Sequence, residues 1–135
     1  MTVFVDTSAL IAFLDRRDRS HDDVLQTWQE LRDSAIPVVT TNYVLLETLA
    51  LVQSRLGLEA ARNLVEDVVP LIAVEWVTPE LHEAGIEAVL AANRRDLSLV
   101  DCISFAVMRR LGLSHAFAVD EHFREQGFDC LPAQP

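Results

Sequence analysis

Short apolar runs alternate along the chain with longer segments in which apolar residues recur at the three- and four-residue spacing of a helix. The runs predict β-strands at residues 2–5, 37–40, 71–77 and 115–119, and an edge strand at 128–131. The longer segments predict helices at residues 8–15, 22–33, 42–56, 59–69, 80–93, 98–111 and 121–126. Strands separated by helices are typical of right-handed βαβ crossovers, which build a mostly parallel sheet covered on both faces. We therefore predict an α/β fold with three layers, formed by a single domain that spans residues 1–135.

The charge balance limits the molecules that this chain can bind. It has 21 acidic residues against 11 basic ones, all of them arginine, and a net charge of -10. The average field of such a protein repels phosphate. A role in nucleic-acid binding therefore needs local arginine clusters or bound cations.

Several other classes of protein are disfavoured. The longest uncharged run, residues 34–46, is too short to span a membrane, and the N-terminus lacks the basic region and apolar core of a signal peptide. Cys102 and Cys130 have no metal-binding spacing and are expected to be free thiols. No glycine-rich nucleotide-binding motif is present. These features predict a cytoplasmic protein with no membrane partner.

Four acidic residues occupy positions that need an explanation. Asp6 and Asp120 follow predicted strands, where ligands of parallel α/β sheets bind, but each is also suited to cap the helix that follows. Glu47 lies on an apolar helix face with no basic residue three or four positions away. Asp101 also lacks a cationic neighbour on its helix. Ser98 and Asp101 resemble a capping box, although aspartate is shorter than the usual glutamate.

Asp6, Glu47, Asp101 and Asp120, here called the acidic quartet, are predicted to converge at one edge of the sheet. Converging carboxylates repel one another unless their pKa values rise or a cation binds between them. Oxygen ligands without nearby histidine or cysteine favour Mg²⁺ or Mn²⁺ over Zn²⁺. Such an ion can activate water for attack on a phosphodiester, and it attracts the phosphate that the net charge repels. The quartet therefore predicts metal-dependent phosphodiester hydrolysis.

The segments that carry the quartet resemble a known family. The chain is similar to PIN-domain nucleases, most closely the VapC-like toxins of bacterial toxin–antitoxin pairs, in VFVDTSALIAFLDRRDRSH, in NYVLLETLALV around Glu47, and in LSLVDCISFAVMRRLGLSHAFAVDEHF with the GF that follows. The resemblance covers essentially the whole chain. It implies a Rossmann-like fold, ribonuclease activity that depends on Mg²⁺ or Mn²⁺, a homodimer, and a cognate antitoxin as partner.

The resemblance also implies roles for individual residues. It assigns metal binding and catalysis to the acidic quartet, orientation of the first acid to Thr7 or Ser8, and a supporting hydrogen bond to Ser104. Many family members have a threonine just before the last acid, whereas this chain has Ala118 and Val119. This difference removes a supporting hydroxyl but leaves the four acids intact, so it bears on the details of the substrate rather than on activity.

Two groups of arginines are candidates for contact with RNA phosphates. Arg16 and Arg17 follow the first helix, and Arg94 and Arg95 precede the last long helix. Ordinary solvated loops are the alternative for both groups. His122, two residues after Asp120, could approach the site, but we expect it on the solvent-facing side of its helix.

The leading hypothesis is a metal-dependent endoribonuclease that hydrolyses RNA and acts as a toxin. One alternative is a PIN-like binding module without catalysis. Another, less favoured, is an aspartyl-phosphate phosphatase with Asp6 as nucleophile, because Ser8 stands where that chemistry usually needs a second acid. Neither the RNA that is cut nor the number of bound ions follows from the sequence.

Overall fold

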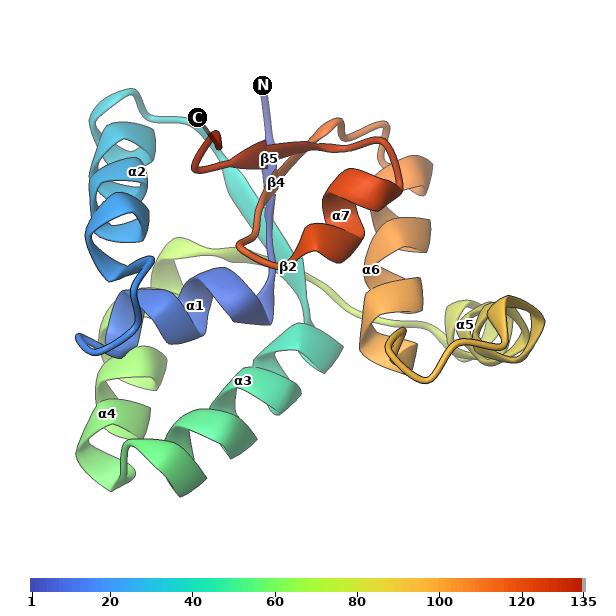
Figure 1. The fold of residues 1–135 in the computed structure, drawn as a ribbon, viewed down its shortest axis with the longest axis horizontal. Coiled ribbons are helices and arrows are strands. Elements are labelled where there is room, and N and C mark those ends of the chain that lie inside the picture. Colours follow the sequence, from blue (N-terminus) through green and yellow to red (C-terminus); the bar gives the residue numbers. More distant parts are fainter. Residues whose placement is uncertain (135) are drawn as a thin grey trace.

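All five strands of the sheet are parallel in the computed structural model of the chain, which describes residues 1–134 (Figure 1). The order across the sheet is β3-β2-β1-β4-β5. The strands are β1 (Val3–Val5), β2 (Val38–Thr41), β3 (Ala73–Glu75), β4 (His115–Phe117) and β5 (Asp129–Leu131). The predicted α/β fold is confirmed, and the strand expected at the edge, β5, lies there.

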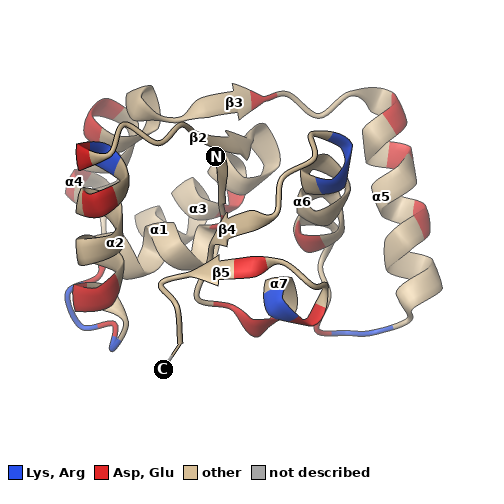
Figure 2. Ribbon diagram, turned by 90° about the horizontal axis from the view of Figure 1, so that it is seen from above, with Lys and Arg blue, Asp and Glu red and all other residues tan. Residues whose placement is uncertain are grey.

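Helices cover both faces of this sheet. Within residues 1–134 the α-helices are α1 (Thr7–Leu14), α2 (His21–Asp33), α3 (Asn42–Arg55), α4 (Leu58–Asn63), α5 (Pro79–Ala92), α6 (Leu99–Arg110) and α7 (Glu121–Glu125). In both Figure 1 and Figure 2, α1, α2 and α4 lie on one side of the strands and α5 and α6 on the other. No helix in this part of the chain combines the length and apolar character needed to cross a bilayer.

Aromatic side chains hold α6 and α7 against the sheet. Phe4 of β1 and Phe123 of α7 are fully buried, and their rings stack with centroids 6.2 Å apart. Phe105 of α6 meets Phe123 edge to face at 5.0 Å. Burying each such side chain contributes about 1.5–3 kcal/mol. This packing fixes the orientation of two helices whose N-termini carry members of the acidic quartet.

The connections from strand to helix determine where the site lies. Helix α1 begins two residues after β1 ends, and α3 begins directly after β2. Helix α7 follows β4 after three residues. Because the strands are parallel, these three helix starts lie at the same edge of the sheet. Polar residues in the connections are therefore brought together from distant parts of the sequence.

The predicted helix at 59–69 is α-helical only in its first half. Helix α4 ends at Asn63, and the chain continues through a π-helical turn (Leu64–Val68) and a 3₁₀ turn (Val69–Leu71). Pro70 cannot donate a backbone hydrogen bond, so the regular α pattern cannot continue through it. As a result, β3 begins at Ala73 and is shorter than predicted.

Candidate active site

Asp6 connects β1 to α1 and is almost completely buried, with 4% of its surface exposed. Its backbone N–H donates to the carbonyl of Phe117 on β4, which joins the end of the central strand β1 to its neighbour β4. Its carboxylate oxygen Oδ2 accepts hydrogen bonds from the Ser8 N–H at 3.1 Å and from the Ser8 hydroxyl at 2.7 Å. Asp6 is therefore the N-cap of α1, a role that the sequence left as an alternative to the site.

The Ser8 hydroxyl joins two distant parts of the chain. Besides donating to Asp6, its oxygen accepts hydrogen bonds from the backbone N–H groups of Val119 at 3.0 Å and Asp120 at 3.2 Å. Both of these groups belong to the connection between β4 and α7. One hydroxyl therefore fixes the first acid of the quartet relative to the last.

Thr7 and Ser104 make different contacts from those that the family resemblance implied. The Thr7 hydroxyl donates to the carbonyl of Val44 at 3.3 Å and accepts from the Thr48 hydroxyl at 3.0 Å, so it joins α1 to α3. The Ser104 hydroxyl donates to the carbonyl of Val100 at 2.8 Å, one turn earlier in α6. Serine inside a helix commonly bonds back in this way. Of the three hydroxyl residues predicted to support the acids, only Ser8 bonds to one.

Asp101 and Asp120 also cap helices. Asp101 forms a complete capping box at the start of α6: Ser98 Oγ accepts its N–H, and its Oδ2 accepts the Ser98 N–H, both at 3.1 Å. The capping box that the sequence left open is therefore present, although aspartate is shorter than the usual glutamate. At the start of α7, Asp120 Oδ1 accepts the N–H of His122 at 2.9 Å. The partial positive charge at both helix N-termini favours ionised carboxylates there.

The four members of the quartet line one cleft of about 480 Å³, here called the acidic cleft. Three of them come from the connections or helix starts described above, and Glu47 comes from the middle of α3. Glu47 is half-buried and has no ion-pair partner within residues 1–134. The predicted convergence of the four acids in space is therefore present in the structure, and their chemical roles stay predictions.

The surroundings make the ionised form of two of these acids unfavourable. Burial, only partly offset by the hydrogen bonds from Ser8 and increased by repulsion from Asp101 and Asp120, raises the pKa of Asp6 to about 6. Burial also raises the pKa of Asp101, with repulsion from Asp120 adding to the effect. A cation in the acidic cleft would relieve both effects.

The chemistry of the acidic quartet fits a hard divalent cation. The quartet offers only carboxylate oxygens, which suit Mg²⁺ and Mn²⁺. In the part of the chain that the structure describes, no three histidine, cysteine, aspartate or glutamate side chains lie close enough to hold an ion as they stand. The fit therefore depends on the donor chemistry and on the raised pKa values of Asp6 and Asp101.

His122 lies in the acidic cleft, and the expectation that it faces solvent is wrong. Its Nδ1 is 3.0 Å from Asp120 Oδ1 and 3.5 Å from Asp101 Oδ2, while its Nε2 is 3.4 Å from Asp96 Oδ2. Nδ1 is buried but makes no hydrogen bond of good geometry within residues 1–134. Helix α7 begins at the acidic cleft with Asp120 as its N-cap, and His122 is the second residue of the helix. Its side chain therefore lies beside the capping carboxylate. The signal in the sequence that could have placed His122 in the cleft is its position two residues after an acid that caps a helix.

Arg94 is already paired with protein carboxylates. Its guanidinium binds both oxygens of Asp96, at 2.7 and 3.0 Å, and reaches Glu125 at 3.2 Å. The hydrogen bonds from Arg94 lower the pKa of Asp96 to about 2. Arg94 therefore already forms an ion pair with two protein carboxylates, whereas Arg95 forms none within residues 1–134, and contact of either residue with RNA stays a prediction. Figure 2 shows arginines in the loop before α2 and in the loop between α5 and α6.

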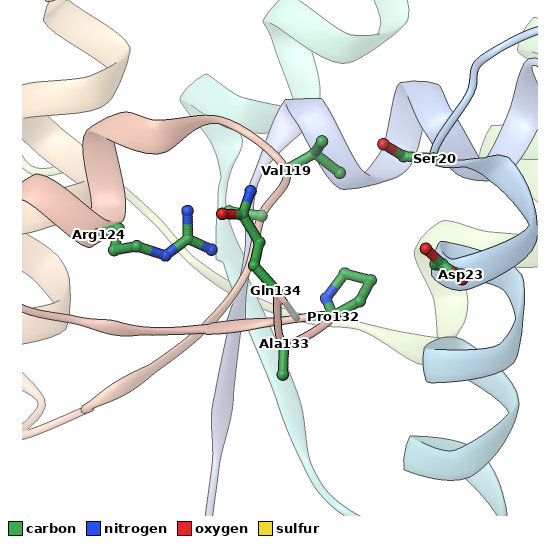
Figure 3. Close-up of a pocket in the computed structure, with 8 residues that line it drawn as sticks. Ser20, Asp23, Val119, Arg124, Pro132, Ala133 and Gln134 are labelled. Carbon is green, nitrogen blue, oxygen red and sulfur yellow. The ribbon is translucent and has the colours of Figure 1, made fainter.

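A second depression, of about 390 Å³, lies beside the C-terminal segment and shares Val119 with the acidic cleft (Figure 3). Arg124 of α7 points into it, with Gln134 nearby and Asp23 of α2 on the opposite wall. It contains no member of the quartet. The acidic cleft, although more open to solvent, is therefore the candidate active site.

Comparison with known proteins identifies the family to which the chain belongs. The family model described as "PIN domain" matches residues 3–129. The chain belongs to the PIN-domain family. This PIN domain is 38% identical over 128 residues to the "23S rRNA-specific endonuclease VapC20" of Mycobacterium tuberculosis, in the CDC 1551 / Oshkosh and ATCC 25618 / H37Rv strains, covering 93% of this chain and 95% of the relative.

Solved structures support the same assignment. The crystal structure of Mycobacterium tuberculosis VapC20, described as a "Sarcin-Ricin loop cleaving toxin", has a TM-score of 0.78 and 36% identity over 93% of this chain and 95% of that one. FitAcB from Neisseria gonorrhoeae has a TM-score of 0.66 at 15% identity over 96% of each chain, which shows a shared fold. The resemblance to PIN-domain nucleases that the sequence suggested is confirmed.

Proposed function

We propose that this PIN domain is a metal-dependent endoribonuclease that hydrolyses RNA phosphodiester bonds and acts as the toxin of a toxin–antitoxin pair. The observation that carries the proposal is the acidic cleft, where four carboxylates from distant parts of the chain line one depression. The relative that is 38% identical over 93% of the chain is named as an endonuclease specific for 23S rRNA. Neither the binding-module nor the phosphatase alternative is favoured.

The proposed chemistry divides the acidic quartet into two roles. Asp6, Asp101 and Asp120 would hold Mg²⁺ or Mn²⁺, which supplies Lewis acidity and lowers the pKa of bound water. Ser8 keeps Asp6 and the Asp120 connection at a fixed separation. Glu47 lines the cleft without a partner among the described residues, so it is free to complete the ligand set or to accept a proton from the attacking water.

Ribosomal RNA is the substrate class to test first, because the similar VapC20 is described as cleaving the sarcin–ricin loop. With that substrate the chain would act in the cytoplasm. A cognate antitoxin protein belongs to the same proposal, since the relative is described as a toxin. A homodimer is proposed as well, and Leu46, Trp76 and Leu90, each at least 70% exposed, offer apolar surface for it.

The test is cleavage of 23S rRNA and of a synthetic sarcin–ricin loop RNA by the purified chain with Mg²⁺, with Mn²⁺ and with a chelator. We expect a discrete cut that requires the metal and is lost in the Asp6→Asn and Asp101→Asn variants. Asp33→Asn, an exposed aspartate at the end of α2, is the matched control and should cut normally. Cleavage that survives the chelator and both cleft substitutions would refute the proposed chemistry.

A further inference from the structure

Arg55 lines two neighbouring clefts, and the sequence did not single it out. One is the acidic cleft. The other, of about 440 Å³, lies between the end of α1 and the junction of α3 with α4, and its lining includes Arg16, Arg17 and Arg55. We call this second cleft the basic depression. Arg55 is the residue that the two linings share.

One face of α3 connects the two clefts. Glu47, Leu51 and Arg55 follow one another at intervals of four residues, so they lie on the same face of the helix, and all three line the acidic cleft. Eight residues correspond to about 12 Å along a helix axis. Helix α3 therefore presents a carboxylate beside the other acids and a guanidinium at the far end of the same cleft.

The arginines on this side are not occupied by protein carboxylates. Within residues 1–134 neither Arg55 nor Arg16 nor Arg17 forms an ion pair, and all three are exposed. Asp15, the acid in the lining of the basic depression, uses its carboxylate to accept the backbone N–H of Arg17 at 3.0 Å. A free guanidinium can bind a phosphate through two parallel hydrogen bonds.

On the side of the acidic cleft where Asp96 lies, the arginine is already paired with protein carboxylates. Arg94 is held by both oxygens of Asp96 and by Glu125, and Asp96 itself lines the cleft. An RNA strand that leaves the site over that side meets the Asp96 carboxylate and the Arg94 guanidinium, which already donates its hydrogen bonds to protein carboxylates. In a protein of net charge -10, the direction in which an RNA strand runs depends on such local differences.

We propose that Arg55 is a positioning residue for RNA that binds a phosphate flanking the one to be cut and directs the strand into the basic depression of Arg16 and Arg17. The inference rests on the proposed function and deepens it, because it names the side on which the strand leaves the site. An arginine in the last turn of a helix also has a purely structural role, since it interacts favourably with the helix dipole. The test must separate these two roles.

Cleavage kinetics of the full chain on a synthetic sarcin–ricin loop RNA with Mg²⁺ separate them. Arg55→Ala should raise KM roughly tenfold, as expected for the loss of a charge-assisted hydrogen bond, and leave kcat nearly unchanged. The slope of log(kcat/KM) against log of the salt concentration should become less steep by about 0.7, the value for one phosphate contact on a single strand. Arg55→Lys should recover part of the loss.

Arg110→Ala is the matched control, because Arg110 is also exposed and also lies in the last turn of a helix, α6. It should change neither KM nor the salt dependence. Neutral methylphosphonate linkages, placed one at a time at the phosphates flanking the cut, should identify one position that raises KM for the unaltered chain but not for Arg55→Ala.

Two outcomes would overturn the inference. If Arg55→Ala lowers the melting temperature but keeps the KM and salt dependence of the unaltered chain, Arg55 serves only the end of α3, and the proposed ribonuclease function stands. If no methylphosphonate position distinguishes the two proteins, Arg55 does not contact a phosphate. Absence of any cleavage by the unaltered chain would instead refute the proposed function, and the inference with it.

Discussion

Replacing Asp6 with asparagine should stabilise the folded chain when no divalent cation is bound. Asp6 is 4% exposed, and burial, together with repulsion from two other acids, raises its pKa from 3.8 to about 6. Asparagine has nearly the same shape and keeps an oxygen that can accept the two hydrogen bonds from Ser8. The substitution therefore removes an unfavourable charge without removing the cap of α1.

The size of the effect follows from the two pKa values. Raising the pKa of Asp6 from 3.8 to about 6 means that its ionisation costs about 3 kcal/mol more in the folded protein than in the unfolded chain. Between these pH values the folded protein binds more protons than the unfolded chain. The free energy of unfolding therefore falls as the pH rises through this interval, and it stays lower above it. An asparagine side chain is neutral at every pH, so the Asp6→Asn variant avoids this loss.

Urea unfolding of chelator-treated protein, followed by circular dichroism from pH 4 to pH 8, measures the difference. We expect Asp6→Asn to be more stable than the unaltered chain by up to about 3 kcal/mol at pH 8, with the advantage disappearing near pH 4. Asp33→Asn, which replaces an exposed aspartate, should show no such pH-dependent difference. A variant that is no more stable at pH 8, or whose advantage does not change with pH, would refute the argument that burial and repulsion act on Asp6.

Three further substitutions test other parts of the structure. Ser8→Ala removes a donor to Asp6 and leaves two backbone N–H groups without an acceptor, so it should lower the free energy of unfolding by about 1–3 kcal/mol and slow RNA cleavage. Gly85→Ala places a Cβ against the end of Ile103, 2.8 Å from its Cγ1, so thermal unfolding should show a loss of about 1–2 kcal/mol that Ile103→Val partly restores. Arg94→Ala should leave KM for RNA nearly unchanged, in contrast to Arg55→Ala, because its guanidinium is already bound by carboxylates.

Local signals along the chain were sufficient to predict the order and type of almost every element. Helix α3 and helix α5 begin and end within one residue of the predicted positions, since their ends coincide with Gly57 and with Pro79 and Asn93. The segment after α4 was different, because Pro70 predicts the end of the α-helix but not the π-helical and 3₁₀ turns that replace its second half. Spacing along the sequence does not report such turns.

Residues of the site were predictable to the extent that their position in the sequence was unusual. Glu47 stood out because an acid without a partner on an apolar helix face is rare. Arg55 did not stand out, since an arginine in the last turn of a helix has an ordinary explanation. Only the meeting of two clefts at its side chain points to the role in RNA binding that we propose. His122 was placed wrongly because the sequence does not show which face of a five-residue helix is turned toward its own cap.

Capping and metal binding, which the sequence posed as alternatives for three of the acids, are compatible because they would use separate oxygens. Asp6 uses only Oδ2 for its two hydrogen bonds, Asp101 only Oδ2, and Asp120 only Oδ1. The second oxygen of each carboxylate accepts no hydrogen bond within residues 1–134 and is free for a cation. A capping hydrogen bond, whether made by an N-cap or by the acid of a capping box, holds one oxygen at a helix start and so limits the direction of the other. Asparagine at these positions can keep the capping oxygen and replace the free one with an NH₂ group. The asparagine variants should therefore fold normally and lose the cation, whereas alanine variants should lose both functions.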